Sequence, residues 1–492
     1  MFTSGGVLLA LEIVASRVLA PTFGNSIFVW GSLIGVFLTA LSVGYWVGGH
    51  VADRYPHHGV FCGLVFLAGL LVVPIPAVSP WLLDRIAQAD VGPRTGPLLA
   101  ATFLFFPASL VMGTVSPFAV RLAARTVQTV GNTAGRLYAL STLGSIVGCL
   151  AAAFWLLSIL GVREIILVLG LVEMGMAILG FAVARRMAAA VVATTALLAA
   201  ALLVPRAASG DPPGLVYARD TVYHRITVSD EGGVRYLKLD NYWQSAMDLQ
   251  EPRRTVFRYA DYMHAGMLFV PEPRQVLLIG VGGGTLPKQY LRDYPGVRMD
   301  MVDIDPHVIE VARRYFHVPV GGRLRAFAED GRQFVRRTSA RYDQVLLDAY
   351  LRDTLPFHLA TREFFQEVRG VLTPRGVFVM NVIGALAGPD SRLFRSVYRT
   401  LREVFPAVYV FPVEFGPWGG EEAMRNIIVV STQEPPEPPA AVRARYGRMR
   451  SRIRIPGFEA VVRDLYTRPV PVQDVPVLSD NFAPVDDLIH AR

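Results

Sequence analysis

Three aspartates in the second half of this chain follow short apolar runs, and their types and spacing suggest a ligand site with acid–base chemistry. They are Asp303 at the end of 298–304, Asp348 directly after 342–347, and Asp330 in the turn after 323–327. Apolar runs of this kind are typical of strands in a buried parallel sheet, whose carboxyl ends meet at one edge. Each aspartate alone could simply cap the next helix. Three of them beside a glycine turn favour a nucleoside site.

That glycine turn lies in residues 275–288, QVLLIGVGGGTLPK. The apolar run 276–279 predicts a buried strand, Gly280, Gly282 and Gly283 form the turn, and a helix follows. Backbone amides at such a helix start can approach a ligand closely. The turn alone is a weak signal, because a GxGxxG motif would need glycine at Thr285. The acidic residue Asp303 lies about 20 residues further on, the distance expected for a ribose-binding carboxylate. Its presence strengthens the interpretation of the turn as part of a nucleoside site.

The elements that must position these residues alternate between strand and helix. From residue 271 to 492 this alternation predicts an α/β Rossmann-like domain of the methyltransferase type, with a doubly wound parallel sheet. A small β-subdomain and a connecting helix are expected at 215–270, from strand-like runs at 223–228 and 234–239 and a helical stretch at 255–268.

The first part of the chain has a different composition. Residues 1–205 contain no lysine, ten arginines and six acidic residues, and they are strongly apolar. Apolar segments close to the ~20 residues that a bilayer requires recur at 5–20, 27–49, 60–78, 97–117, 137–160, 165–184 and 188–204. We therefore expect an α-helical membrane bundle of about seven helices at 1–205, contact with a lipid bilayer, and a linker at 206–214.

Charges within the bundle leave its orientation open. Glu12 and Arg17 are five residues apart and would be costly facing lipid, so we expect them to pair inside the bundle, as a structural pair or as a functional one. Arginines are distributed almost evenly between the two sets of loops, so the positive-inside rule does not choose a side. Residues 49–54, GHVADR, resemble a loop of major facilitator transporters that is cytoplasmic. If the same holds here, the second domain would lie outside the cell.

Composition also argues against other classes of partner. The net charge of +8 is split evenly between the two parts and forms no basic run, so no nucleic-acid partner is expected. Cys62 and Cys149 lie in apolar segments and are interpreted as buried hydrophobes. No ligand cluster has the spacing of a metal site, and no metal is expected.

Four stretches in order and spacing resemble the polyamine aminopropyltransferases, the spermidine synthase family: VLLIGVGGG, MVDIDPHVIEVARRYF, AEDGRQF and YDQVLLDAY. The resemblance extends from about residue 220 to the C-terminus, and LDNYWQ at 239–244 resembles that family's LDGxxQ. The added helical region resembles the membrane-integrated branch of the family. The resemblance implies transfer of the aminopropyl group of decarboxylated S-adenosylmethionine, a co-substrate, to a putrescine-like amine.

The resemblance also implies roles for individual residues. Asp348 would be the catalytic proton acceptor, Asp303 would hold the ribose hydroxyls, and Asp330 with Gly331 would hold the adenine. The remaining members of the implied site are His224 and Gln244 with Gly280, Gly282 and Gly283 on the nucleoside side, and Tyr259, Asp261, Tyr350 and Asp353 on the amine side. A homodimer is left open.

Several positions depart from the family pattern, mainly on the amine side. Thr285 replaces the aspartate of GGGDG, and Ala260 replaces a histidine. Leu351 stands at the second aspartate of the DxxDP motif, with Asp353 shifted by two residues, and His224 replaces a glutamine. The nucleoside half of the site is therefore expected to be retained, and the acceptor can be an amine other than the usual diamine.

Two other classes of function stay open. One is a methyltransferase using intact S-adenosylmethionine on the same fold, and the other is a transporter with a nucleoside-sensing domain.

The apolar helices predict a protein of the cell membrane. Because the sulfonium nucleoside is made inside cells, we expect its second domain to face the cytoplasm.

Overall fold

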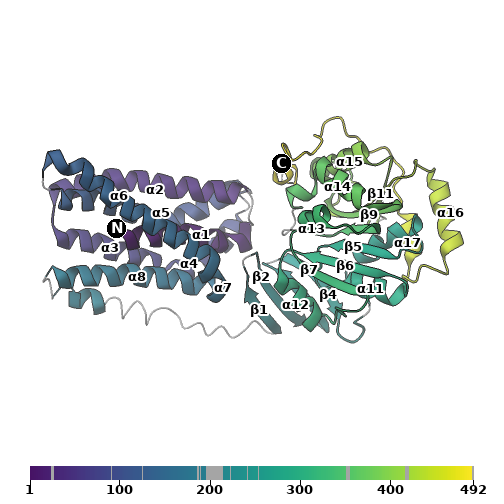
Figure 1. Ribbon diagram of the computed structural model, residues 1–492, viewed down its shortest axis with the longest axis horizontal. Coiled ribbons are helices and arrows are strands. Elements are labelled where there is room, and N and C mark those ends of the chain that lie inside the picture. Colours follow the sequence, from purple (N-terminus) through teal and green to yellow (C-terminus); the bar gives the residue numbers. More distant parts are fainter. Residues whose placement is uncertain are drawn as a thin grey trace. The chain divides into compact units, whose positions relative to one another are not determined.

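The computed structural model describes residues 1–23, 27–89, 91–92, 94–124, 126–184, 188, 190–195, 214–221, 223–240, 242–252, 254–350, 355–415 and 420–489. These residues form two compact units. The helical unit comprises Met1–Pro213 and Asp220–His224, and the α/β unit comprises Gly214–Arg219 and Arg225–Arg492. Figure 1 shows the helices of the first and the sheets of the second.

The helical unit is built from apolar helices, most of them long, together with three short helical segments. They are α1 (Phe2–Phe23), α2 (Ile27–Arg54), α3 (His58–Val72), α4 (Ile75–Gln88), α5 (Thr95–Ala123), η1 (Val127–Thr129), α6 (Val130–Ala151), η2 (Ala152–Leu156), α7 (Leu157–Ile159) and α8 (Val162–Val183). Among the described residues, five helical spans are long and apolar enough to cross a membrane, or six if the pair α3 and α4, bent by 50°, counts as one. The seventh predicted segment, 188–204, lies largely outside the described residues.

Glycines let two of these helices approach closely. A Cβ atom on Gly144 of α6 would lie 1.9 Å from the carbonyl oxygen of Phe2 in α1, and one on Gly148 would lie 2.0 Å from that of Gly6. Small residues four apart, as in the GSIVG stretch, are typical of closely packed helices, and α1 and α6 pack in this way.

The small β-subdomain is a four-stranded sheet in the order β1 (Leu215–Asp220), β2 (Arg225–Glu231), β3 (Val234–Leu239) and β4 (Tyr242–Asp248). Only β2 and β3 were predicted, because the segments of β1 and β4 lack a regular alternation. The expected helix at 255–268 is shorter, with α10 (Tyr259–Tyr262) followed by a 3₁₀ turn η3 (Met263–Leu268).

A seven-stranded sheet is the centre of the α/β unit. Its strands are β5 (Gln275–Ile279), β6 (Arg298–Asp303), β7 (Leu324–Ala328), β8 (Tyr342–Leu347), β9 (Leu372–Gly384), β10 (Ala407–Pro412) and β11 (Arg425–Thr432), in the order β10-β11-β9-β8-β5-β6-β7. The five strands from β9 to β7 are parallel, as predicted. The prediction of a wholly parallel sheet is wrong at one edge, because β11 runs antiparallel to both β9 and β10.

Helices cover this sheet and bury its apolar strands (Figure 1). They are α11 (Thr285–Asp293), α12 (Pro306–Tyr315), α13 (Gly331–Arg337), η4 (Phe357–Leu359), α14 (Arg362–Val371), η5 (Pro389–Ser391), α15 (Arg392–Val404), α16 (Pro439–Met449), α17 (Phe458–Arg463) and α18 (Val485–Ile489).

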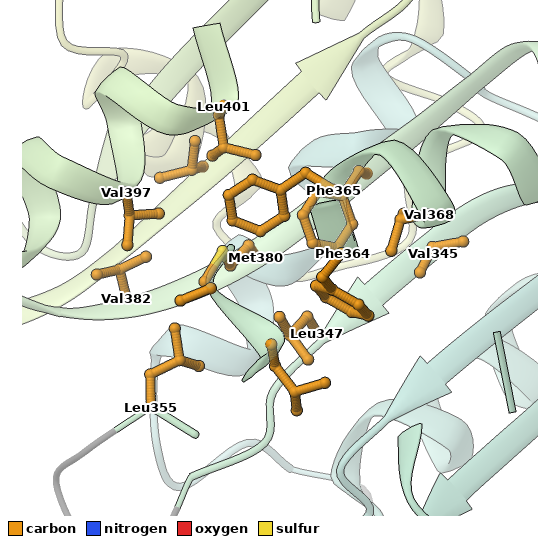
Figure 2. Packing of buried hydrophobic residues seen from close by; sticks show 14 of the residues in the cluster. Val345, Leu347, Leu355, Phe364, Phe365, Val368, Met380, Val382, Val397 and Leu401 are labelled. Carbon is orange, nitrogen blue, oxygen red and sulfur yellow. The ribbon is translucent and has the colours of Figure 1, made fainter. Parts of the chain in front are cut away.

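The packing behind β8 and β9 keeps their carboxyl ends in place. Figure 2 shows Phe364 and Phe365 of α14 against Leu347 of β8 and Met380 of β9. All four side chains are fully buried. Dense packing of this kind limits side-chain movement, so residues just beyond these strands are held in fixed positions.

Candidate active site

The glycine turn after β5 passes close to the end of β8. Gly280 has φ 90°, and a Cβ atom on it would lie 2.3 Å from the carbonyl oxygen of Asp348. A Cβ atom on Gly283 would lie 2.5 Å from Ser245 Oγ in β4. Only glycine fits at both positions, because the first needs a left-handed backbone and both need space. The backbone of the turn therefore forms one wall of the site.

Asp303 lies at the end of β6, directly beside this turn. Its Oδ2 accepts a hydrogen bond of 3.0 Å from the backbone N–H of Val281, and its Oδ1 accepts one of 3.0 Å from Asp305. The carboxylate and the glycine turn thus adjoin each other, as the sequence predicted. A carboxylate in this position can accept hydrogen bonds from vicinal hydroxyls of a ribose.

Asp330 is the N-cap of α13, so it has the helix-capping role that the sequence left open as an alternative to ligand binding. Its carboxylate accepts hydrogen bonds of 3.0 Å from the backbone of Arg332 and Gln333, and it lies 2.9 Å from His358 Nε2. The bond with His358, followed by the backbone bonds, lowers the pKa of Asp330 against the opposing effect of burial. Gly331 is required next to it, since a Cβ atom there would lie 2.4 Å from Ile279. An adenine role for Asp330 and Gly331 stays a prediction.

Asp348 begins the loop after β8 and has two side-chain partners. The hydroxyl of Tyr259 donates to Oδ2 at 3.1 Å, and the amide of Asn381 donates to Oδ1 at 2.9 Å. Burial raises the pKa of Asp348, and the two hydrogen bonds act in the opposite direction because they favour the charged form. Burial, and then the charge of Asp348, also raise the pKa of Tyr259. The net effect is a raised pKa for Asp348.

Asn381 was missed in the sequence, although it is a polar residue within the apolar strand β9. It is buried, and its Oδ1 accepts a hydrogen bond of 3.1 Å from Asn426 of β11. Its backbone oxygen accepts one of 2.7 Å from the hydroxyl of Tyr350, which in turn accepts from the backbone of Ile383 at 2.9 Å. Asn426 therefore orients the Asn381 amide so that its donor faces Asp348.

The other predicted residues are placed as follows. The Asp261 carboxylate contacts Thr255 at 2.7 Å and Arg258 at 3.1 Å, so it belongs to its own polar cluster. Gln244 lies in β4, whose backbone passes 3.8 Å from a Cβ atom built on Gly282. His224 is part of the helical unit and not of the α/β unit that carries the glycine turn. Asp353 lies outside the described residues. The roles predicted for these residues stay predictions.

Metal-ligating side chains do not gather at this site. The described residues contain no group of three or more His, Cys, Asp or Glu side chains that could hold a metal ion. The expected absence of a metal stays a prediction.

Comparison with known proteins places this site in a family. The sequence profile of the spermine/spermidine synthase domain matches residues 257–417. The polyamine aminopropyltransferase of Vibrio vulnificus is 32% identical over 207 residues, which are 40% of this chain and 68% of that protein. This chain belongs to the polyamine aminopropyltransferase family. It is therefore a transferase.

The chain is also similar to other proteins. The enzyme of Neisseria meningitidis serogroup A is 28% identical over 218 residues, 44% of this chain and 78% of that protein. Human eEF1A lysine and N-terminal methyltransferase is 33% identical over 159 residues, 30% of this chain, but the match covers only 22% of that protein. The crystal structure of a probable spermidine synthase from Corynebacterium glutamicum is 19% identical, with a TM-score of 0.42, covering 54% of this chain and 99% of that chain.

In this aminopropyltransferase, Asp303→Ala is expected to weaken binding of methylthioadenosine by about 1.5–3 kcal/mol, because hydrogen bonds from the ligand to a charged group are lost. Calorimetric titration of the full chain measures this. Asp343→Ala is the matched control, since Asp343 also accepts two backbone hydrogen bonds, from Arg274 and Gln275, but at the start of β8. Unchanged affinity in Asp303→Ala would remove this residue from the nucleoside site.

Proposed function

We propose that this chain transfers the aminopropyl group of decarboxylated S-adenosylmethionine to an amine acceptor and releases methylthioadenosine. The observation that carries the proposal is the position of Asp348. Its carboxylate directly follows β8, its backbone N–H donates to the Ile279 carbonyl at 2.8 Å beside the glycine turn, and its side chain is held by Tyr259 and Asn381. These contacts support the proposal, because they hold a carboxylate that could accept a proton next to the wall that would hold the nucleoside.

The reaction needs a proton acceptor because an amine attacks only in its neutral form. The acceptor nitrogen forms a bond to the propyl carbon attached to sulfur, and the carbon–sulfur bond breaks. Its electron pair returns to sulfur, which changes from a sulfonium to the neutral thioether of methylthioadenosine. The nitrogen loses one proton, and Asp348 is the group positioned to take it.

The proposal is tested with the purified full chain and two donors, decarboxylated and intact S-adenosylmethionine, each with putrescine as acceptor. We expect methylthioadenosine and an aminopropylated amine with the first donor only, measured by chromatography and mass spectrometry. S-adenosylhomocysteine from the second donor would instead indicate a methyltransferase. Replacing putrescine with longer and shorter amines then defines the acceptor.

Asn381→Ala is expected to shift the pH dependence of this reaction. The hydrogen bond from Asn381 favours the charged form of Asp348, so its loss raises the pKa of Asp348 further. Because only the unprotonated carboxylate can accept a proton, the acidic limb of kcat/KM should move to higher pH. A merely structural role for Asn381 would lower the rate at all pH values without moving this limb. Asn426→Ala, which frees the Asn381 amide to rotate, should give a smaller shift in the same direction.

We further propose that the helical unit spans the cell membrane and that the α/β unit faces the cytoplasm. The length and apolarity of the described helices support the first part. The second part is supported by the ligand, since a cationic sulfonium nucleoside made inside the cell does not cross a bilayer unaided. The test is a reporter enzyme that is active only in the periplasm, fused to the C-terminus of the chain. A signal from this reporter would contradict the cytoplasmic placement.

A further inference from the structure

Glu414, just beyond β10, has a backbone conformation that glutamate rarely adopts. Its φ is 54°, in the left-handed region that favours glycine. Buried groups hold it there: the hydroxyl of Tyr262 accepts a hydrogen bond of 3.1 Å from the N–H of Glu414 and donates one of 2.6 Å to Asp464. The Asp464 carboxylate also accepts one of 3.2 Å from the N–H of Phe415. Backbone strain that the surrounding structure fixes in this way is typical of functional sites.

The strand order brings Glu414 to the same edge of the sheet as Asp348. Because β11 is antiparallel to both β9 and β10, β10 runs in the same direction as β8 and β9 and ends at their carboxyl edge. Hydrogen bonds follow this edge from Asp348 to Asn381 and from Asn381 to Asn426. The carbonyl of Asn426 then accepts a hydrogen bond of 2.9 Å from the N–H of Val413, the residue before Glu414. Asp348 and Glu414 therefore lie at the two ends of one connected row.

A second path between the two residues runs through Arg258. Its Nε lies 3.8 Å from Glu414 Oε1, and the next residue, Tyr259, donates to Asp348. Arg258 lies closer to Asp261, at 3.1 Å, so one cation stands beside two carboxylates. The Asp261 side chain is only 5% exposed, whereas that of Glu414 is 67% exposed. Of the two carboxylates, Glu414 is the one that a ligand can reach.

A diamine acceptor would need such a carboxylate in the proposed reaction. One amino group must be neutral to attack, while the other stays an ammonium group at neutral pH. Its charge has the same sign as that of the donor sulfonium, so the two repel each other unless a negative group offsets them. A carboxylate away from the reacting atoms can bind this second ammonium group without taking part in the chemistry.

We propose that Glu414 binds the second, non-reacting ammonium group of a diamine acceptor and so selects diamines over monoamines. The inference rests on the proposed function, since Asp348 is taken as the residue beside the reacting amine. Three strand spacings of ~4.8 Å separate β8 from β10. The two side chains, two hydrogen bonds of ~2.9 Å and a four-carbon diamine are together long enough to cover this distance.

The test compares putrescine with 1-aminobutane, which has the same carbon chain and only one amino group. In the full chain, Glu414→Gln should lower kcat/KM for putrescine by about tenfold or more, because a hydrogen bond between two charged groups is lost. It should leave kcat/KM for 1-aminobutane unchanged. Equal losses for the two amines would indicate a merely structural role and overturn the proposal, as would unchanged values for both.

Glu434→Gln is the matched control. Glu434 follows the far end of β11, at the opposite edge of the sheet. Its side chain is 60% exposed and lies 3.9 Å from Arg375, so it resembles Glu414 in exposure and in its distance to an arginine. This variant should retain kcat/KM for both amines.

Two further variants separate the carboxylate from the backbone strain. Glu414→Gly removes the carboxylate and suits a φ of 54°, so it should leave the melting temperature unchanged or raise it, and still lose the preference for putrescine. Glu414→Asp draws the carboxylate back by one methylene group, so the preference should shift toward 1,5-diaminopentane. A preference for putrescine that survives in Glu414→Gly, or does not shift in Glu414→Asp, would overturn the proposal.

Equilibrium binding of radiolabelled putrescine in the presence of methylthioadenosine separates this inference from the proposed function. If no amine is aminopropylated but Glu414→Gln still weakens putrescine binding by about tenfold, the proposed function fails and the diamine site stands. If methylthioadenosine forms, but Glu414→Gln and the natural chain choose alike between putrescine and 1-aminobutane, the diamine site fails and the proposed function stands.

Discussion

Asp348→Asn is expected to lower turnover by about 10²–10⁴-fold while leaving the affinity for methylthioadenosine unchanged. Asparagine has nearly the shape of aspartate and can keep its place between Tyr259 and Asn381, but it cannot accept the proton of the attacking amine. Steady-state rates with decarboxylated S-adenosylmethionine and putrescine measure the first effect. Calorimetric titration with methylthioadenosine measures the second.

The control for this prediction is Glu310→Gln, which removes an exposed carboxylate of α12 in the same unit. Its turnover should stay at that of the natural chain. If Asp348→Asn retains its turnover as well, Asp348 is not the base, and Asp261 or Asp353 becomes the residue to test.

Gly280→Ala is expected to weaken methylthioadenosine binding by roughly 100-fold or more, since the turn would move away from Asp303 and at least two hydrogen bonds to charged groups would be lost. The substitution has two costs. Alanine is strained at φ 90°, and its Cβ atom would lie 2.3 Å from the carbonyl oxygen of Asp348, which is backbone and cannot rotate away.

Gly233→Ala separates these two costs. Gly233 lies in the turn between β2 and β3 with φ 80°, and a Cβ atom there would meet nothing within 4 Å. This variant therefore carries the strain, about 1–2 kcal/mol, without the clash. It should lower the melting temperature and keep the nucleoside affinity. Equal losses of affinity in the two variants would show that the close approach of Gly280 to Asp348 is not important for the site.

The position of Asp303 beside the glycine turn could be predicted because it depends on local sequence. A short apolar strand, a glycine turn and an aspartate at the next strand end are contiguous signals, and the parallel arrangement brings such strand ends together. The structure shows this placement, because the backbone N–H of Val281, next to Gly280, donates to the Asp303 carboxylate. The role of these residues toward a nucleoside stays a prediction. The five parallel strands followed from the alternation of strand and helix for the same reason.

The residues that the sequence did not reveal depend on pairing between distant segments. Asn381 faces Asp348 only because β9 lies beside β8. Asn426 reaches Asn381 only because β11 inserts antiparallel between β9 and β10. A single asparagine within an apolar run does not indicate its partner. Glu173, a buried carboxylate of α8, was overlooked for a similar reason, since its hydrogen-bond partner Ser4 of α1 is 169 residues away.

The strand order also has a consequence for how such enzymes can diversify. The chain builds β5, β6 and β7 first, on one side, and then crosses once to lay β8, β9, β11 and β10 on the other. Asp348 and its partner Asn381 come from this later segment, whereas Asp303 and Val281, at the glycine turn, come from the earlier one. Under the proposed function, substitutions around Asn381 can therefore alter acceptor choice while Asp303 and the glycine turn, encoded before residue 342, keep their sequence.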